Sequence, residues 1–335
     1  MSFVIDEQEQ TILDAPTFPI QDMFSKIRHE VRNHENVLVS ISGGSDSDIL
    51  LDAIHRFDPE KKATYVFFNT GLEYAATKQH LSELEKKYDI EIVWVPPVIP
   101  IPICCRKYGV PFWSKQVSEF ISRLQRHNFR WEDRPFEELV KEYPRCVSAL
   151  EWWCNAKPKR RNGGESSFNI GYTPWLKEFM IANPPNFPIS QMCCKKAKKE
   201  PAARYEKDHD FELQCVGIRK AEGGARAKAH KTCITRAFAG ADTFRPMFWL
   251  TDQDKRDYKE HYGIVNSDCY EVWGMDRTGC CGCPFGKNFE QELKLMEQYE
   301  PKMYKAANNI FGESYEYTRK YLQFRQEMKE KAKNI

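Results

Sequence analysis

The sequence predicts an α/β fold built on a doubly wound parallel sheet. Three apolar runs of strand length, residues 37–41, 63–68 and 90–95, alternate with two stretches in which apolar residues recur at helical spacing. Strands that alternate with helices pair in parallel, because the intervening helix carries the chain back across the sheet. Ligands of such sheets bind beyond the carboxyl ends of the strands. We therefore expect a binding site at the loops that follow residues 41 and 68.

The first of these loops has the composition of a phosphate-binding loop. It reads Ser-Gly-Gly-Ser-Asp-Ser, and it joins the first predicted strand directly to the first predicted helix. Glycines let the backbone approach an anion, while the N–H groups of a first helical turn and serine hydroxyls donate hydrogen bonds to it. The loop lacks the Lys-Ser/Thr pair of the ordinary P-loop, and a capped turn is the plainer alternative. The candidate anion-binding residues are Ser42, Gly43, Gly44, Ser45, Asp46 and Ser47.

Composition narrows the class of protein without selecting a partner. The 335 residues are 41% hydrophobic, which suffices for a large core with a smaller lobe. A net charge of +2 favours neither an acidic nor a basic partner. No apolar run reaches membrane-spanning length, so we expect a cytoplasmic protein with no membrane partner. In that compartment the twelve cysteines indicate metal or redox chemistry rather than disulfides.

The order of the patterns divides the chain into five predicted parts. They are a helical lead-in (1–36), an α/β core (37–103), a helical insertion (104–192), the remainder of the core with the cysteine-rich part (193–288) and a helical tail (289–335). The tail carries an aromatic stripe at helical spacing, from Tyr317 and Tyr321 to Phe324, which we interpret as core or interface.

A basic segment in the insertion raises the question of nucleic acid. Residues 157–164 include four Lys or Arg residues and lie near Trp152, Trp153 and Trp175. Basic side chains beside aromatic rings bind single strands through phosphates and base stacking. A solvated loop is the alternative that we favour.

Two cysteine pairs far apart in the sequence offer four thiolates. Cys193 and Cys194 are adjacent, whereas Cys280 and Cys283 form a Cys-x-x-Cys pair before a proline. Such pairs suit an iron–sulfur cluster or a zinc ion, and zinc remains the alternative. Adjacent cysteines bind one tetrahedral ion awkwardly, which favours the cluster. The other cysteines that we keep as alternatives are Cys104, Cys105, Cys233, Cys269 and Cys281.

These motifs together resemble one superfamily. The loop at 42–47 resembles the PP-loop of the N-type ATP pyrophosphatases, and residues 69–74 resemble the second nucleotide loop of the phosphoadenylylsulfate (PAPS) reductase family. An Asp is usual in that family where this chain has Asn69. Residues 217–226 resemble the family's arginine element, and the cysteine pairs resemble its [4Fe-4S] arrangement. The resemblance covers 37–74 and 193–285.

The resemblance implies a fold of the adenine nucleotide α-hydrolase type that binds ATP with Mg²⁺. It implies that Asn69, Thr70 and Gly71 bind the nucleotide, and that Arg219 and Arg226 balance charge at the α-phosphate. Asp46 would bind Mg²⁺ or act only as a helix cap. The resemblance also implies that a [4Fe-4S] cluster is held by Cys193, Cys194, Cys280 and Cys283.

The departures from the reductase pattern favour ATP chemistry. No cysteine follows Cys283, although the reductases use a C-terminal cysteine as nucleophile, and the phosphate loop is complete, which suits a pyrophosphate chain. The chain therefore resembles the sulfur-inserting pyrophosphatases of tRNA thiolation and DNA phosphorothioation. These would adenylate an acceptor, release pyrophosphate and let sulfur delivered at the cluster displace AMP.

Two alternatives remain at this stage. One is a PAPS or adenylylsulfate reductase that uses an external thiol, and the other is a non-catalytic, cluster-bearing nucleotide sensor or DNA-binding subunit. The expected partners are an adenine nucleotide and a sulfur donor protein or external thiol. Nucleic acid and a second copy of the chain are left open.

Overall fold

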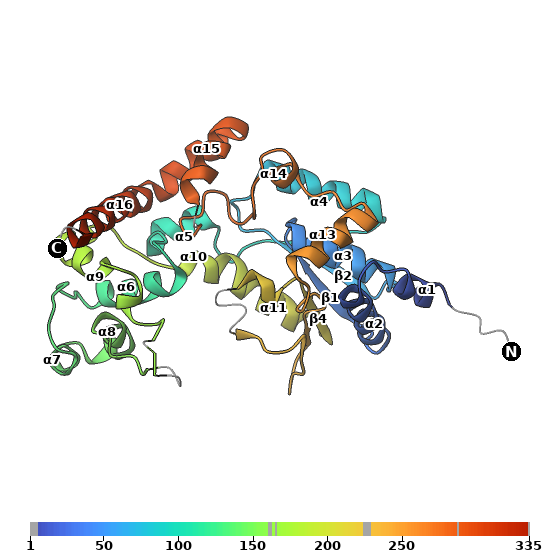
Figure 1. Cartoon of the computed structure of the whole chain (residues 1–335), viewed down its shortest axis with the longest axis horizontal. Helices are drawn as coiled ribbons and strands as arrows, with labels where there is room; N and C mark the ends of the chain where they lie inside the picture. Colours follow the sequence, from blue (N-terminus) through green and yellow to red (C-terminus); the bar gives the residue numbers. More distant parts are fainter. Residues whose placement is uncertain (1–5, 160–162, 165, 224–228, 287, 334–335) are drawn as a thin grey trace. The chain divides into compact units, whose positions relative to one another are not determined.

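The computed structural model describes the chain except residues 1–5, 160–162, 165, 224–228, 287 and 334–335 (Figure 1). The chain forms two compact units, each built from two segments. We call Met1–Val98 with Ala197–Cys281 the sheet unit, and Ile99–Lys196 with Gly282–Ile335 the helical unit.

The sheet unit contains six strands in the order β3-β2-β1-β4-β6-β5. Neighbouring strands run parallel, except that β5 pairs antiparallel with β6. Val37 of β1 stands beside Ala63 on one side and Leu213 on the other. The predicted α/β class with a parallel sheet is confirmed. The strands are β1 (Val37–Ile41), β2 (Ala63–Phe68), β3 (Ile92–Val95), β4 (Leu213–Val216), β5 (Ile234–Thr235) and β6 (Asp242–Phe244).

Apolar side chains fill both faces of this sheet. Val37, Val39 and Ile41 of β1 join one core cluster, whereas Leu38 between them joins another, as the two-residue period of a strand requires. The larger cluster also takes residues from α2 (Phe18–Arg32), α3 (Ser45–Arg56), α4 (Ala75–Tyr88) and α13 (Asp252–Tyr262). On the other face, Tyr205 of α11 (Glu200–Asp208) packs against Leu38 and its neighbours. The sheet is therefore doubly wound.

Local signals explain where the helices of the sheet unit begin and end. The first, α1 (Glu7–Leu13), begins after Asp6, whose carboxylate accepts the N–H of Glu9. Thr251 and Asp254 form a capping box at the start of α13, and Gly263 ends that helix in the left-handed conformation. The short α14 (Asp268–Glu271) packs against α4.

The helical unit packs its helices around aromatic side chains. Phe179 contacts the rings of Tyr317, Tyr321 and Phe324, so the aromatic stripe of the tail is core, as one of our two interpretations has it. Tyr317 and Tyr321 donate hydrogen bonds to the carbonyls of Asn183 and Pro174. The helices are α5 (Ile101–Tyr108), α6 (Lys115–Arg126), α7 (Phe136–Glu142), α8 (Val147–Trp153), α9 (Leu176–Ala182), α10 (Met192–Cys194), α15 (Phe289–Tyr299) and α16 (Pro301–Lys333).

Stacking of bases on the tryptophans beside the basic segment, which we ranked below a solvated loop, is excluded for two of the three rings. Trp152 and Trp153 are 1% and 0% exposed, and the indole of Trp153 donates to the carbonyl of Glu132. Lys157 is paired with Glu151 and Ser148. Burial of the large apolar area of these rings is favourable, and this gain exceeds the preference of the polar residues that follow them for solvent. Arg160 and Arg161 lie outside the described residues.

Among the described residues, no helix combines the length and the apolar character that crossing a membrane requires.

Candidate nucleotide site

The predicted phosphate loop lies between β1 and α3 and adopts a conformation that needs its first glycine. Gly43 has φ +63°, and a Cβ there would lie 2.8 Å from Cγ2 of Thr77. Gly44 is the N-cap of α3, which begins at Ser45. The N–H groups of the first turn of α3 are thus presented at the carboxyl edge of the sheet, as an anion site requires.

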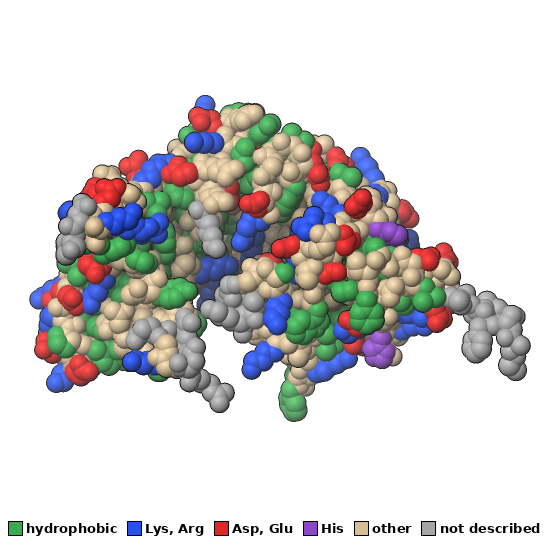
Figure 2. Space-filling view, in the orientation of Figure 1, with side chains coloured by type: hydrophobic (Ala, Val, Ile, Leu, Met, Phe, Trp, Pro, Cys, Tyr) green, Lys and Arg blue, Asp and Glu red, His purple; other side chains and the backbone are tan. Residues whose placement is uncertain are grey.

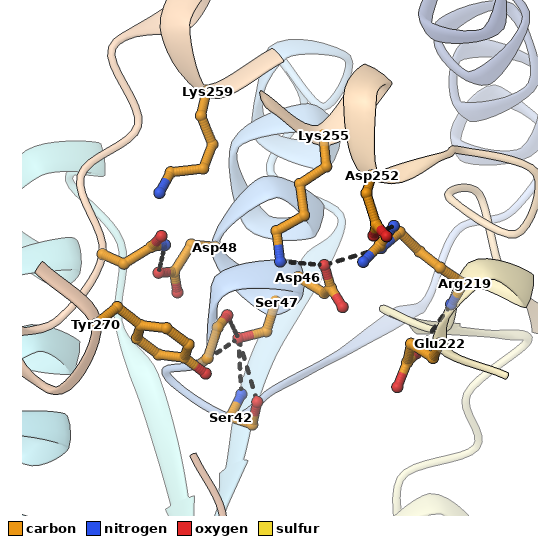
Figure 3. A network of polar contacts seen from close by, with 12 residues as sticks. Ser42, Asp46, Ser47, Asp48, Arg219, Glu222, Asp252, Lys255, Lys259 and Tyr270 are labelled. Carbon is orange, nitrogen blue, oxygen red and sulfur yellow. Dashed lines mark hydrogen bonds and ion pairs between the residues drawn. The ribbon is translucent and has the colours of Figure 1, made fainter. Parts of the chain in front are cut away.

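Ser47 stabilises the loop from within. Its hydroxyl accepts hydrogen bonds from the N–H groups of Ser42 (3.2 Å) and Gly44 (3.1 Å), and it donates one to the carbonyl of Gly44 (2.8 Å) (Figure 3). This hydroxyl donates its one proton to the Gly44 carbonyl, so Ser47 shapes the loop, and its predicted hydrogen bond to a ligand stays a prediction.

A cavity of about 510 Å³ opens beside this loop in the sheet unit. Three cations from separate segments line it, namely Arg219, Lys255 and Arg277. Acidic side chains also line the cavity, and they include Asp46 and Glu222. The cavity therefore joins a helix N-terminus to several fixed positive charges, which is the environment that phosphates prefer.

Asp46 lies between two of these cations. Its Oδ1 accepts from Nε of Arg219 at 3.0 Å and lies 2.8 Å from Nζ of Lys255 (Figure 3). Asp46 is not the cap of α3, because the cap position belongs to Gly44. The alternative of a mere capping role for Asp46 is therefore wrong. The carboxylate orders two cations at the edge of the cavity, and a role in binding Mg²⁺ stays a prediction.

Arg219 is buried, at 5% exposure, and is held by acids on both sides. Its Nη1 donates to Asp252 at 2.8 Å, while its backbone N–H donates to Glu222 at 3.0 Å. Burial opposes the charged form of Arg219, but Asp46 and Asp252 outweigh burial and raise its pKa. The guanidinium is thus fixed by Asp46 and Asp252, whereas Glu222 accepts only the backbone N–H of Arg219. Arg226 lies outside the described residues.

Two further residues, Tyr270 and Thr278, lie beside the phosphate loop, and both come from the segment before the Cys-x-x-Cys pair. The hydroxyl of Tyr270 accepts the N–H of Thr278 at 3.0 Å and lies 3.0 Å from the Thr278 hydroxyl. Burial raises the pKa of Tyr270, and hydrogen bonds from Thr278 and the backbone of Ser45 oppose that shift. The phenol thus lies at the N-terminus of α3. Sequence reasoning missed Tyr270 and Thr278, and it also missed Lys255.

The second predicted loop uses its polar groups internally. The Asn69 side chain accepts the N–H of Gly71 at 2.8 Å, and Thr70, fully buried, donates its N–H to Glu73 at 3.0 Å. Burial raises the pKa of Glu73, although Lys198 and the bonds from Thr70 oppose this. Their part in nucleotide binding stays a prediction.

A second cavity, of about 340 Å³, adjoins the first in the sheet unit. The two cavities share Ser42 and Thr278, and the second is lined by Phe67, Phe68 and Glu73 together with two further cations, Lys198 and Lys199. A polar cavity that continues into a partly apolar one matches the two ends of a nucleotide, phosphate and base.

Buried polar networks anchor α3 below the loop. Asp48, 1% exposed, accepts from Asn266 at 2.7 Å and contacts His80 at 2.9 Å. One turn later, Asp52 accepts from Tyr88 (3.0 Å) and from Tyr258 (2.6 Å). These contacts tie the helix that carries the loop to α4, α13 and the segment before α14.

In the helical unit, α5 and α10 bring together cysteines that the sequence keeps apart. Helices α5 and α10 pack on each other, which places the Cys193 thiol beside that of Cys105. The pKa of Cys193 is raised, first by its bond to Cys105 and also by burial and by nearby Cys283. Cys280 belongs to the sheet unit.

No metal centre is evident from the arrangement of these thiols. Among the described residues, no group of three or more His, Cys, Asp or Glu side chains is arranged to hold a metal ion. The predicted ligands Cys193, Cys194 and Cys283 are nevertheless in one unit, with Cys105 as an unexpected neighbour. The cluster therefore stays a prediction.

Comparison with family models and with curated proteins finds no match. Among solved structures, the chain is similar to PAPS reductase from Candida auris in a phosphate complex, with 14% identity, a TM-score of 0.41, and coverage of 81% of this chain and 93% of that one. It is also similar to NH3-dependent NAD synthetase from Campylobacter jejuni in complex with the nitrate ion, with 11% identity, a TM-score of 0.36, and coverage of 90% and 94%. The assignment of the site rests on the residues of this chain.

Proposed function

We propose that the chain binds ATP with Mg²⁺ at the loop between β1 and α3 and transfers AMP to an acceptor, releasing pyrophosphate, as the first step of a sulfur insertion. One observation carries this proposal. The glycine loop at the start of α3 opens on a cavity lined by Arg219, Lys255 and Arg277, and that cavity continues into a second, partly apolar one.

The arrangement of the loop and the two cavities suits a nucleoside triphosphate. The pyrophosphate end would lie over the first turn of α3, where backbone N–H groups and three cations offset its charge. Gly217 permits close packing here, since a Cβ on it would lie 3.1 Å from the carbonyl oxygen of Asp46. The base would then occupy the cavity beside Phe67 and Phe68.

The chemistry asks mainly for positioning and charge. An acceptor oxygen attacks the α-phosphorus, the bond from that phosphorus to the bridging oxygen breaks, and pyrophosphate leaves with the electron pair. Mg²⁺, when bound, would offset part of the charge on the leaving pyrophosphate. Arg219, already oriented by Asp46 and Asp252, offsets negative charge that builds up in this step. A sulfide-type nucleophile then displaces AMP from the adenylated acceptor.

Calorimetry with ATP and with PAPS tests the proposal. We expect ATP with Mg²⁺ to bind at least tenfold more tightly, a difference of about 1.4 kcal/mol, because the loop is suited to a pyrophosphate chain. We also expect pyrophosphate release from ATP when the acceptor is supplied. Tighter binding of PAPS, with sulfite released in the presence of a thiol, would replace this proposal by a reductase.

The thiols of the helical unit fit the soft donor set of an iron–sulfur cluster, which when bound would supply a site for sulfur delivery. We predict that anaerobically prepared protein is brown and contains iron and sulfide. Cys194→Ala and Cys283→Ala should lose the colour, and Cys105→Ala should lose it too, because Cys105 contacts Cys193.

The control for the cysteine variants is Cys154→Ala, which lies in the same helical unit but is not a candidate ligand, and it should keep its iron. Metal analysis and absorption spectra give the readout. A Cys280→Ala variant that retains the cluster while Cys105→Ala loses it would identify Cys105 as the fourth ligand. Colourless protein with one zinc and no sulfide would contradict the cluster.

A further inference from the structure

The helical unit carries a large charge of its own, which the near-neutral chain conceals. Its two segments contain 26 Lys and Arg residues against 17 Asp and Glu residues, a net charge of +9. The sheet unit contains 24 against 31, a net charge of −7. An excess of this size within one unit favours a polyanionic partner for that unit. Figure 2 shows Lys and Arg side chains on the surface of both units.

A groove of about 900 Å³ lies in this unit, along α5, α6 and the segment that leads into α10. Lys107, Arg126 and Lys195 line it, and all three are exposed. The acid in its lining, Glu119, is paired with Arg123 at 2.5 Å. Within the part of the chain that the structure describes, no ion pair joins the three cations to an acid. Their charge is therefore available to a ligand.

The groove is built rather than incidental. The Gln125 side chain donates to the carbonyl of Phe187 (2.8 Å) and accepts the N–H of Ile189 (2.9 Å), which fixes the wall opposite α6. Val110 and Ile189 form a parallel bridge at the end of α5. A wall held at both ends keeps the groove formed before a ligand arrives, which lowers the entropic cost of binding.

The uncharged lining distinguishes among polyanions. The half-exposed ring of Tyr108 lies beside Lys107, with the ammonium 5.2 Å from its centre. The exposed amides of Asn128 and Asn186 also line the groove. A ring that stacks and amides that read base edges, placed between cations, are the elements that bind unpaired nucleotides. A membrane surface or an acidic peptide uses the cations but not this combination.

We infer that this groove binds single-stranded nucleic acid, which is the acceptor class of the proposed reaction. The statement that the strand is the acceptor rests on the proposed function, whereas the binding of the strand to the groove is independent of it. The groove also adjoins the cysteine helices, since Lys107 follows Cys105 by two residues and Lys195 follows Cys194 directly. A strand along the groove therefore passes the ends of α5 and α10, where the thiols lie.

The test uses the full chain and a labelled single strand of about 12 nucleotides, in DNA and RNA forms, with fluorescence anisotropy as readout. The triple variant Lys107→Gln, Arg126→Gln, Lys195→Gln should bind about 100-fold more weakly at low salt. Its plot of log affinity against log salt should be shallower by about 2, since each lost phosphate contact on a single strand contributes about 0.7.

The matched control removes three exposed cations of the same unit outside the groove: Lys302→Gln, Lys305→Gln, Lys320→Gln. It should bind the strand nearly as well as the wild type. Equal losses in both triple variants would reduce the effect to net charge and overturn the inference. Duplex DNA, or phosphatidylserine vesicles, bound more tightly than the single strand through the same three residues would also overturn it.

ATP calorimetry on the same variants separates the two proposals. Both triple variants should bind ATP like the wild type, because the nucleotide cavities are lined by the sheet unit. ATP binding without strand binding would overturn the groove and leave the proposed function. Strand binding without ATP binding would overturn the proposed function and leave the groove as a nucleic-acid site.

Discussion

Gly44→Val is expected to abolish ATP binding and to leave the fold intact. Gly44 has φ −104° and ψ 157°, a conformation that valine adopts without backbone strain. A Cβ there would lie 3.1 Å from the Tyr270 hydroxyl and 3.2 Å from that of Ser42. The methyl groups of valine would therefore project into the cavity, where the loop must approach a phosphate. We expect at least a 100-fold loss of affinity, about 2.7 kcal/mol.

Calorimetry measures this loss, and thermal unfolding shows whether the fold survives. The control is Gly312→Val on α16, where an added Cβ meets nothing within 4 Å. It should bind ATP like the wild type. ATP binding by Gly44→Val at wild-type affinity would exclude the loop as the phosphate site.

Asp52→Ala is expected to cause the largest loss of stability, about 3 kcal/mol of the free energy of unfolding. The Asp52 carboxylate is 3% exposed and accepts hydrogen bonds from Tyr88, from Tyr258 and twice from Arg56, at 2.7 and 3.1 Å. Alanine would leave two buried hydroxyls and a partly buried guanidinium without this acceptor. The cost of leaving these groups unpaired exceeds the gain from no longer burying a carboxylate.

Urea unfolding measures this effect against a matched helix pair. Asp22 pairs with Lys26 at the same spacing as Asp52 with Arg56. The side chains of Asp22 and Lys26, however, are 40% and 38% exposed. Asp22→Ala should cost no more than about 0.5 kcal/mol. Similar small values for both variants would show that the network around Asp52 does not anchor α3.

Local patterns predicted the half of the sheet that includes β1, β2 and β3. Each of these strands is a continuous apolar run followed by a break, so the signal lies within a few residues. The strands β4, β5 and β6 gave no comparable signal, because they are two to four residues long and exist through pairing with neighbours. The phosphate loop was equally local, since its glycines, serines and strand–helix setting are adjacent in sequence.

The remainder of the site depends on contacts that a sequence does not reveal. Lys255 belongs to a helix rich in charged residues, and in such a helix a site lysine looks like any solvated one. Tyr270 reaches the loop only because α14 packs on α4. Cys105 meets Cys193 because α5 packs on α10, although 88 positions separate them. Distance in sequence hides each of these partners.

The division of each unit into two segments affects how the chain folds. Strand β1 pairs with β4, and Val37 is the partner of Leu213 in this pairing. The whole first segment of the helical unit, Ile99–Lys196, is synthesised after β1 and before β4. At about 5–20 residues per second, β1 waits roughly 10–30 s on the ribosome with one edge unpaired. Such non-local parallel pairing folds slowly, and an open apolar edge invites aggregation. A fragment that ends at residue 196 would carry that exposed edge permanently, so the sheet unit cannot be isolated by a single cut of the chain.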